Sequence, residues 1–138
     1  MITHTAQATN AIKWIDALKG GKRGYKKGIF SLGQKVNHNT NEPQSYCCLG
    51  VGCKVLNVKV DDWGVSYDET FTKLVGLYNN EGYLNNKVID FNDCLTGIND
   101  FVYSGDKTFT NIRKFILKHL DDIFIPPVAS KLKQHYGK

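Results

Sequence analysis

Apolar residues at helical spacing mark the first element of the chain. Four of them recur every three or four positions: Ala11, Ile12, Ile15 and Leu18. Thr9 and Asn10 precede this stripe, and both side chains are suited to capping the start of a helix. Two glycines at positions 20 and 21 then interrupt the pattern. The spacing therefore predicts a helix over residues 9–18.

A second amphipathic pattern lies near the other end of the sequence. Its apolar stripe consists of Ile112, Phe115, Ile116 and Leu120. The stripe predicts a helix that packs on the core, with Thr108 as its N-cap. The prolines at 126 and 127 end the following turn and favour a last short helix over residues 128–136.

Shorter patterns between these helices predict strands. Residues 29–32 form a short apolar run, and residues 58–60 and 65–67 flank a turn as a hairpin would. The most apolar segment, residues 45–56, predicts a strand that runs into a buried helix, with Gly50 and Gly52 at close contacts. Short helices are also expected at 70–77 and 91–100.

Together these elements predict an α+β fold, in which a small antiparallel sheet packs with several short helices. The chain has 138 residues, of which 41% are hydrophobic and 22% charged, an ordinary globular composition. We therefore expect a single domain over residues 1–138, with residues 126–138 as an extended C-terminal tail.

The cysteines and the N-terminus bear on the compartment. No apolar run approaches the roughly 18 residues of a membrane helix, and no secretory signal opens the chain, so a cytoplasmic location without membrane contact is expected. Buried thiols then account better than disulfides for Cys47, Cys48, Cys53 and Cys94. The spacings of cysteine and histidine match no zinc site, so neither a metal nor another cofactor is expected.

The net charge of +5 is unevenly distributed. Residues 1–60 carry nine Lys or Arg against two acids, whereas residues 61–138 carry nine against eleven. The basic half favours an anionic partner, which can be a nucleotide, a nucleic acid or an acidic protein face.

Much of that charge lies in a glycine-rich segment, residues 19–28, with five cations and four glycines. It offers cations and backbone amides for a phosphate and one aromatic ring for a base. The candidate ligand-binding residues here are Lys22, Arg23, Tyr25, Lys26 and Lys27. The spacing of a Walker loop is absent, and a solvated basic turn is the alternative interpretation.

Asn99 and Asp100 are further candidates for ligand binding. A polar pair at a helix end can contact a ligand or a partner. Capping of local backbone amides is the alternative, because Asn and Asp often do this at such positions.

Three sequence motifs carry a family resemblance. They are the Trp14-to-Lys22 segment, the Tyr46-Cys47-Cys48-Leu49-Gly50-Val51 run with Cys53, and Leu95-Thr96-Gly97-Ile98-Asn99-Asp100. In their order and approximate spacing over residues 12–120, the chain resembles a family of small, mostly uncharacterised bacteriophage proteins. Here the basic turn is longer and richer in lysine, and the sequence from Pro126 extends past the usual end of the pattern. The resemblance implies a viral origin, the host cytoplasm as location and an accessory role such as countering host defence.

No pairing of a nucleophile with a base and no cofactor motif stands out, so a binding protein is favoured over an enzyme, with no catalytic residue assigned. The leading hypothesis is an accessory phage protein that sequesters a small phosphorylated ligand such as a nucleotide signal. The alternatives are a protein that inhibits a host defence factor by direct contact, and a nucleic-acid-binding protein. A homo-oligomer is compatible with each.

Overall fold

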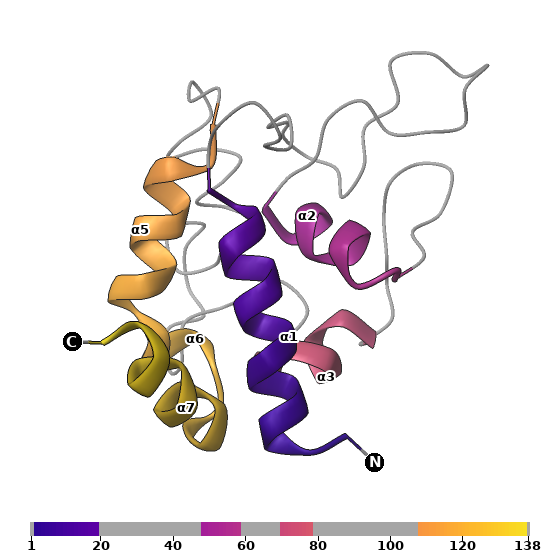
Figure 1. Ribbon diagram of the computed structural model, residues 1–138, viewed down its shortest axis with the longest axis vertical. Helices are drawn as coiled ribbons and strands as arrows, with labels where there is room; N and C mark the ends of the chain where they lie inside the picture. Colours follow the sequence, from indigo (N-terminus) through magenta and orange to yellow (C-terminus); the bar gives the residue numbers. More distant parts are fainter. Residues whose placement is uncertain (1, 20–47, 59–69, 79–107, 138) are drawn as a thin grey trace.

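The computed structural model describes residues 2–19, 48–58, 70–78 and 108–137. Within these ranges the chain forms helices α1 (His4–Ala17), α2 (Cys48–Val55), α3 (Thr70–Val75), α5 (Thr110–Lys118), α6 (Leu120–Ile123) and α7 (Pro126–Tyr136). Helix α1 lies between α2 and α3 on one side and α5, α6 and α7 on the other (Figure 1). It is the central element around which the core forms.

The prediction of an α+β fold with an antiparallel sheet is wrong, because the described residues form helices and no strand. Among the described residues, β-type pairing is limited to one isolated antiparallel bridge between Leu77 and Phe124. A short apolar run such as residues 48–55 has the same pattern in a buried strand and in a buried helix, and here it is helical. The strands predicted at 29–32 and 65–67, most of the one at 58–60, and the helix at 91–100 lie outside the described residues.

Helix α1 begins five residues earlier than predicted. Thr3 is its N-cap, and the Oγ1 of Thr3 accepts a hydrogen bond from the amide of Ala6 at 3.0 Å. Thr9 does not cap the helix; its hydroxyl donates to the carbonyl of Thr5, one turn back inside α1. The predicted end agrees, since Leu18 is the C-cap.

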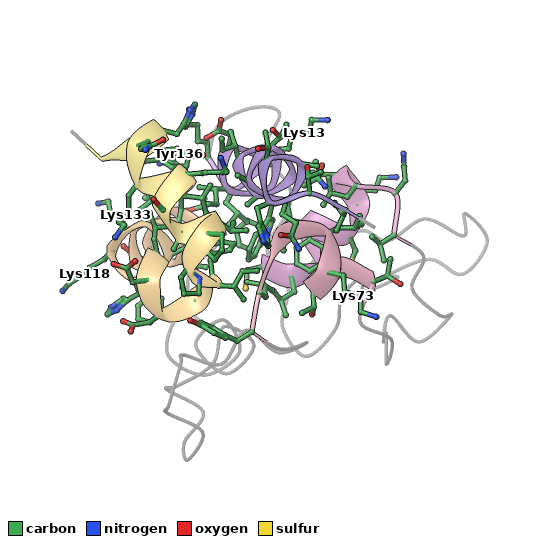
Figure 2. All side chains as sticks on the ribbon, turned by 90° about the horizontal axis from the view of Figure 1, so that it is seen from below. Lys13, Lys73, Lys118, Lys133 and Tyr136 are labelled. Atoms are coloured by element: carbon green, nitrogen blue, oxygen red, sulfur yellow. The ribbon has the colours of Figure 1, made fainter. Side chains whose placement is uncertain are left out.

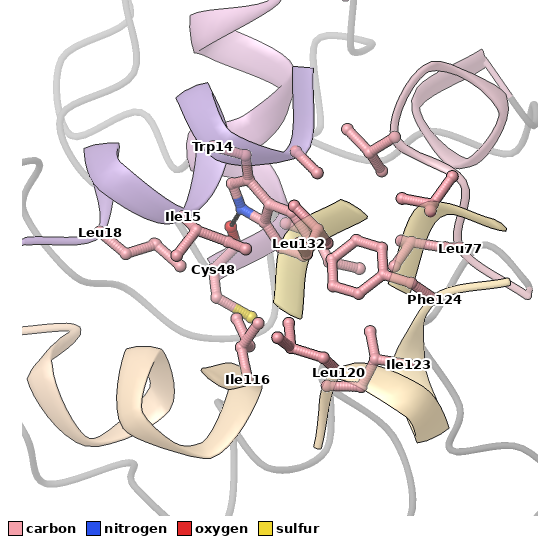
Figure 3. Close-up of a cluster of buried hydrophobic side chains, with 14 of the residues drawn as sticks. Trp14, Ile15, Leu18, Cys48, Leu77, Ile116, Leu120, Ile123, Phe124 and Leu132 are labelled. Carbon is pink, nitrogen blue, oxygen red and sulfur yellow. Dashed lines mark hydrogen bonds between the residues drawn. The ribbon is translucent and has the colours of Figure 1, made fainter. Parts of the chain in front are cut away.

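Trp14 of α1 is fully buried at the centre of the core (Figure 3). Its ring meets Phe71 edge-on at a centroid distance of 5.1 Å and Phe124 at 6.1 Å. Its Nε1 donates a hydrogen bond to the carbonyl oxygen of Cys48 at 2.8 Å. One side chain thus joins α1 to α2, α3 and the residue that follows α6.

Helix α2 is buried over most of its length, in agreement with its apolar sequence. Cys48 and Cys53 are buried as thiols, as predicted, whereas Cys47 and Cys94 lie outside the described residues. Gly52 faces the ring of Phe71, and a Cβ at this position would overlap that ring. The prediction of a close contact at Gly52 is therefore confirmed.

Helix α5 buries Ile112 and Ile116 completely, as predicted, but Phe115 is only partly buried. Thr108 does not cap this helix; its hydroxyl lies 3.2 Å from that of Thr110, and the N-cap position is occupied by Phe109. The helical path breaks at His119, so Leu120 belongs to the short helix α6.

Helix α7 starts at two prolines, which fit the first turn of a helix because they lack the amide that would be unpaired there. The amide of Ile125, just before α7, donates to the carbonyl of Gly76 at 2.9 Å. The helix packs against α1 and buries Val128, Ala129 and Leu132. In the part of the chain that the structure describes, no helix has both the length and the apolar character to span a membrane.

Candidate functional site

All seven residues predicted to bind a ligand lie outside the described residues: Lys22, Arg23, Tyr25, Lys26, Lys27, Asn99 and Asp100. The structure does describe Lys19, the first cation of the basic segment, and the end of α1 that leads into it. The residues around that end are therefore the part of the candidate site whose geometry is known.

Four polar side chains meet at the C-terminal end of α1, and we call them the polar junction: Asp16, Lys19, Arg113 and Tyr136. They come from α1, the residues just after it, α5 and α7, up to 120 positions apart in the sequence. Only tertiary packing brings them together, which is why the sequence patterns did not reveal the junction.

Arg113 of α5 binds the last turn of α1. Its Nε donates to the carbonyl of Ile15 at 3.1 Å, and its Nη2 lies 3.6 Å from Oδ1 of Asp16. The carbonyl end of a helix carries partial negative charge, so a guanidinium there is favourable. Arg113 thereby fixes the direction in which α1 ends.

Tyr136 of α7 binds the same turn, next to Arg113. Its hydroxyl donates to Oδ1 of Asp16 at 2.8 Å and lies 3.5 Å from the carbonyl of Ile12. Burial, and then the hydrogen bond to the Asp16 carboxylate and its negative charge, raise the pKa of Tyr136 well above its ordinary value, while the charge of Arg113 opposes this shift. The tyrosine therefore remains a neutral donor at physiological pH.

Lys19 is the exposed member of the junction. Its ammonium lies 4.0 Å from Oδ1 of Asp16, and 61% of its side chain is accessible to solvent. Asp16 already accepts from Tyr136 and faces Arg113, so this exposed pair adds little stability. Lys19 is available to contact a ligand anion.

The polar junction holds the last turn of α1 in place and has no side chains suited to catalysis. Its one carboxylate is engaged by a hydroxyl and two cations, and it has no thiol, imidazole or unengaged base. Within the described ranges, no cluster of three or more His, Cys, Asp or Glu side chains could hold a metal ion.

A second set of polar contacts joins α1 to α3. The side-chain amides of Gln7 and Asn10 donate to the carbonyls of Lys73 and Leu74 at 2.8 and 2.9 Å. These carbonyls belong to the last turn of α3, where no helical amide follows to pair with them. The signal in the sequence is a pair of amide side chains three positions apart, which places both on the same side of α1. The contact holds α1 against α3 and has a structural role.

Comparison with family models, with curated proteins and with solved structures gives no match to this chain. Three motif residues that the structure describes have packing roles, since Trp14, Cys48 and Cys53 are all buried in the core. The described parts of the first two motifs therefore account for the fold more directly than for a ligand; the third motif lies outside the described residues.

Proposed function

We propose that this chain is a binding protein that sequesters a small phosphorylated ligand, such as a nucleotide signal, through the basic segment that follows α1. Cations at Lys22, Arg23, Lys26 and Lys27 would contact phosphate oxygens, and Tyr25 would stack on a base. To sequester such a ligand, the protein needs cations for the phosphate and an aromatic ring for the base, and no catalytic group.

The observation that carries this proposal is the polar junction at the end of α1. Arg113 and Tyr136 both hold the last turn of the helix, so the basic segment starts from a fixed point. A binding segment that is anchored at its base loses less conformational freedom when a ligand binds, which favours affinity. Lys19 places the first exposed cation at that base.

The resemblance to small bacteriophage proteins supports an accessory role in an infected cell. A nucleotide signal combines an anionic phosphate with a planar base, and a protein with cations beside an aromatic ring suits both groups. Countering a host defence by removing such a signal is therefore the role that we propose.

The test replaces Lys22, Arg23, Lys26 and Lys27 together by Gln. Thermal unfolding is followed with a panel of nucleoside phosphates and cyclic dinucleotides, because a ligand at a hundredfold excess over Kd stabilises the native state by about 2.7 kcal/mol. We expect a shift for the natural chain with one class of nucleotide and none for the quadruple variant.

A variant with the same loss of charge elsewhere, Lys13, Lys54, Lys131 and Lys138 to Gln, is the matched control. It should keep the thermal shift, and Tyr25→Ala should weaken it, since stacking on an aromatic contributes roughly 1–3 kcal/mol per base. If no nucleotide shifts the natural chain and the quadruple variant still acts in a phage-infection assay, sequestration is wrong and a protein inhibitor takes its place.

A further inference from the structure

The described residues of the second half carry net positive charge, although that half as a whole is acidic: six Lys or Arg stand against two carboxylates. Over all the described residues there are nine Lys or Arg and only three carboxylates, Asp16, Asp121 and Asp122. The other acids of the second half all lie between positions 61 and 106. The acidic balance of that half therefore does not describe α5, α6 and α7.

Each of these three carboxylates already faces a basic side chain. Asp16 faces Arg113 and Lys19; Lys133 lies 2.9 Å from Asp121; and Nδ1 of His119 lies 3.3 Å from Asp122. Among the described residues, no carboxylate lies within ion-pair distance of Lys114 or Lys118. These two ammonium groups are exposed and not neutralised by the helices around them.

Lys114 and Lys118 lie one turn apart on the exposed side of α5, opposite the buried Ile112 and Ile116. Like charges at this spacing destabilise a helix by roughly 0.2–0.5 kcal/mol. Lys118 gains from its position in the last turn, but Lys114 does not. Helix stability alone therefore gives no reason for the pair.

Lys133 of α7 borders this pair, and its ion pair with Asp121 offsets the negative charge of a carboxylate close to Lys118. It is paired with Asp121, three residues after Lys118, so α7 brings it close to the end of α5. Figure 2 shows Lys118 and Lys133 on the same side of the helical core, away from Lys73. We call Lys114, Lys118 and Lys133 the α5/α7 lysine surface.

We propose that the α5/α7 lysine surface contacts the phosphate backbone of duplex nucleic acid. Lysine is a flexible point charge suited to phosphate contacts that carry no sequence information. Protein interfaces are depleted in lysine, which argues against a protein partner here. A membrane surface is disfavoured because the apolar side of α5 is already buried in the core. This surface is separate from the basic segment proposed to bind a small ligand.

The test measures binding to a short fluorescent DNA duplex by anisotropy, between about 50 and 200 mM salt. The natural chain should bind, with log K falling linearly against log salt. Lys114→Gln with Lys118→Gln should weaken binding and reduce the magnitude of that slope by about 1.8, since each phosphate contact contributes about 0.9.

Lys54→Gln with Lys131→Gln is the matched control, because it removes the same charge from α2 and from the other side of α7. We expect its slope to equal that of the natural chain, and circular dichroism should show both variants folded. An equal loss in both variants would mean that net charge alone drives binding and would overturn the proposal. So would the absence of duplex binding, or equal binding to polyglutamate, which would indicate an acidic protein partner.

The quadruple Gln variant of the basic segment separates the two proposals. It should lose nucleotide binding and retain most duplex binding. If it loses duplex binding while the Lys114 and Lys118 variant retains it, the basic segment is the nucleic-acid contact and the α5/α7 lysine surface is not.

Discussion

Trp14 contacts three other parts of the core through one side chain. Its indole nitrogen satisfies a carbonyl of α2, and its ring faces Phe71 and Phe124. A tryptophan in such a position contributes both apolar contact and a buried hydrogen bond. The stability of the fold should therefore depend on the indole N–H of Trp14 as well as on the size of its ring.

Trp14→Phe should lower the free energy of unfolding by roughly 2–4 kcal/mol, because it removes the donor to Cys48 and leaves a small cavity. Urea denaturation measures this loss. Lys13→Gln, at the neighbouring exposed position, is the control and should stay within roughly 0.5 kcal/mol of the natural chain. Equal stability of the two variants would contradict the central role of Trp14.

On α5, Ile116→Ala should destabilise the protein more than Phe115→Ala. The stripe in the sequence predicts a large loss for Phe115, but that side chain is only partly buried, whereas Ile116 is fully buried. We expect roughly 2–5 kcal/mol for Ile116→Ala and a smaller loss for Phe115→Ala. Chemical denaturation of both variants would show the order, and the reverse order would mean that α5 is rotated about its axis.

The hydroxyl of Tyr136 should make stability depend on alkaline pH. Its pKa is raised in the folded state above the ordinary value near 10, so the stabilisation that it provides is fully present below about pH 10 and is lost as the pH rises toward the folded value. The free energy of unfolding should therefore fall more steeply above about pH 10 for the natural chain than for Tyr136→Phe. Parallel pH profiles would show that the pKa of Tyr136 is not raised in the folded protein.

At the scale of elements, the close approach of α2 and α3 depends on one glycine. Gly52→Ala would gain roughly 1 kcal/mol of helix propensity but would push a Cβ into the ring of Phe71, so we expect a net loss of roughly 1–3 kcal/mol. Combining it with Phe71→Leu should remove most of that loss, because the ring is gone. A double-mutant cycle measures this coupling, and additive losses would contradict the contact.

The elements also show what sequence patterns can predict. The helices around Ile15, Ile112 and the prolines before Val128 follow from apolar spacing and from proline geometry. The start of α1 was misplaced because Thr9 can either cap a helix or bond back within one, and its sequence neighbours do not decide between these roles. The apolar run over residues 45–56 predicts part strand and part helix, because a short apolar run fits both a buried strand and a buried helix. The described part of it, Cys48–Val55, is the helix α2.

At the scale of the whole molecule, α7 is an integral part of the core. Ending the chain after Ile125 would remove Val128, Ala129 and Leu132 and expose the core surface against which they pack. Burial of the Val and Leu side chains alone contributes roughly 3–6 kcal/mol to the free energy of unfolding. That is comparable to the total stability of a small domain. We expect the truncated chain to lose cooperative thermal unfolding by circular dichroism, while removal of Lys138 alone should have no effect. A stable truncated protein would mean that α7 only covers a core complete without it.

The candidate site was less accessible to prediction than the fold. Basic and aromatic residues at 22–27 stand out in the sequence because they are adjacent, whereas Asp16, Arg113 and Tyr136 are distant and individually ordinary. Nothing local indicates that an arginine on one helix will bind the end of another. Likewise, the exposed lysines of α5 became apparent only once Ile112 and Ile116 defined its inner side.

The packing of α1 against α7 also has a consequence during synthesis of the chain. The hydroxyl of Tyr136 reaches Asp16 across 120 positions, and α7 begins only at Pro126. At roughly 5–20 residues per second, a ribosome needs roughly 5–20 s to proceed from the end of α1 to the start of α7. Throughout that interval the apolar side of α1 lacks its last partner. Part of the apolar side of α1 therefore stays uncovered, and open to wrong contacts, until α7 has been made.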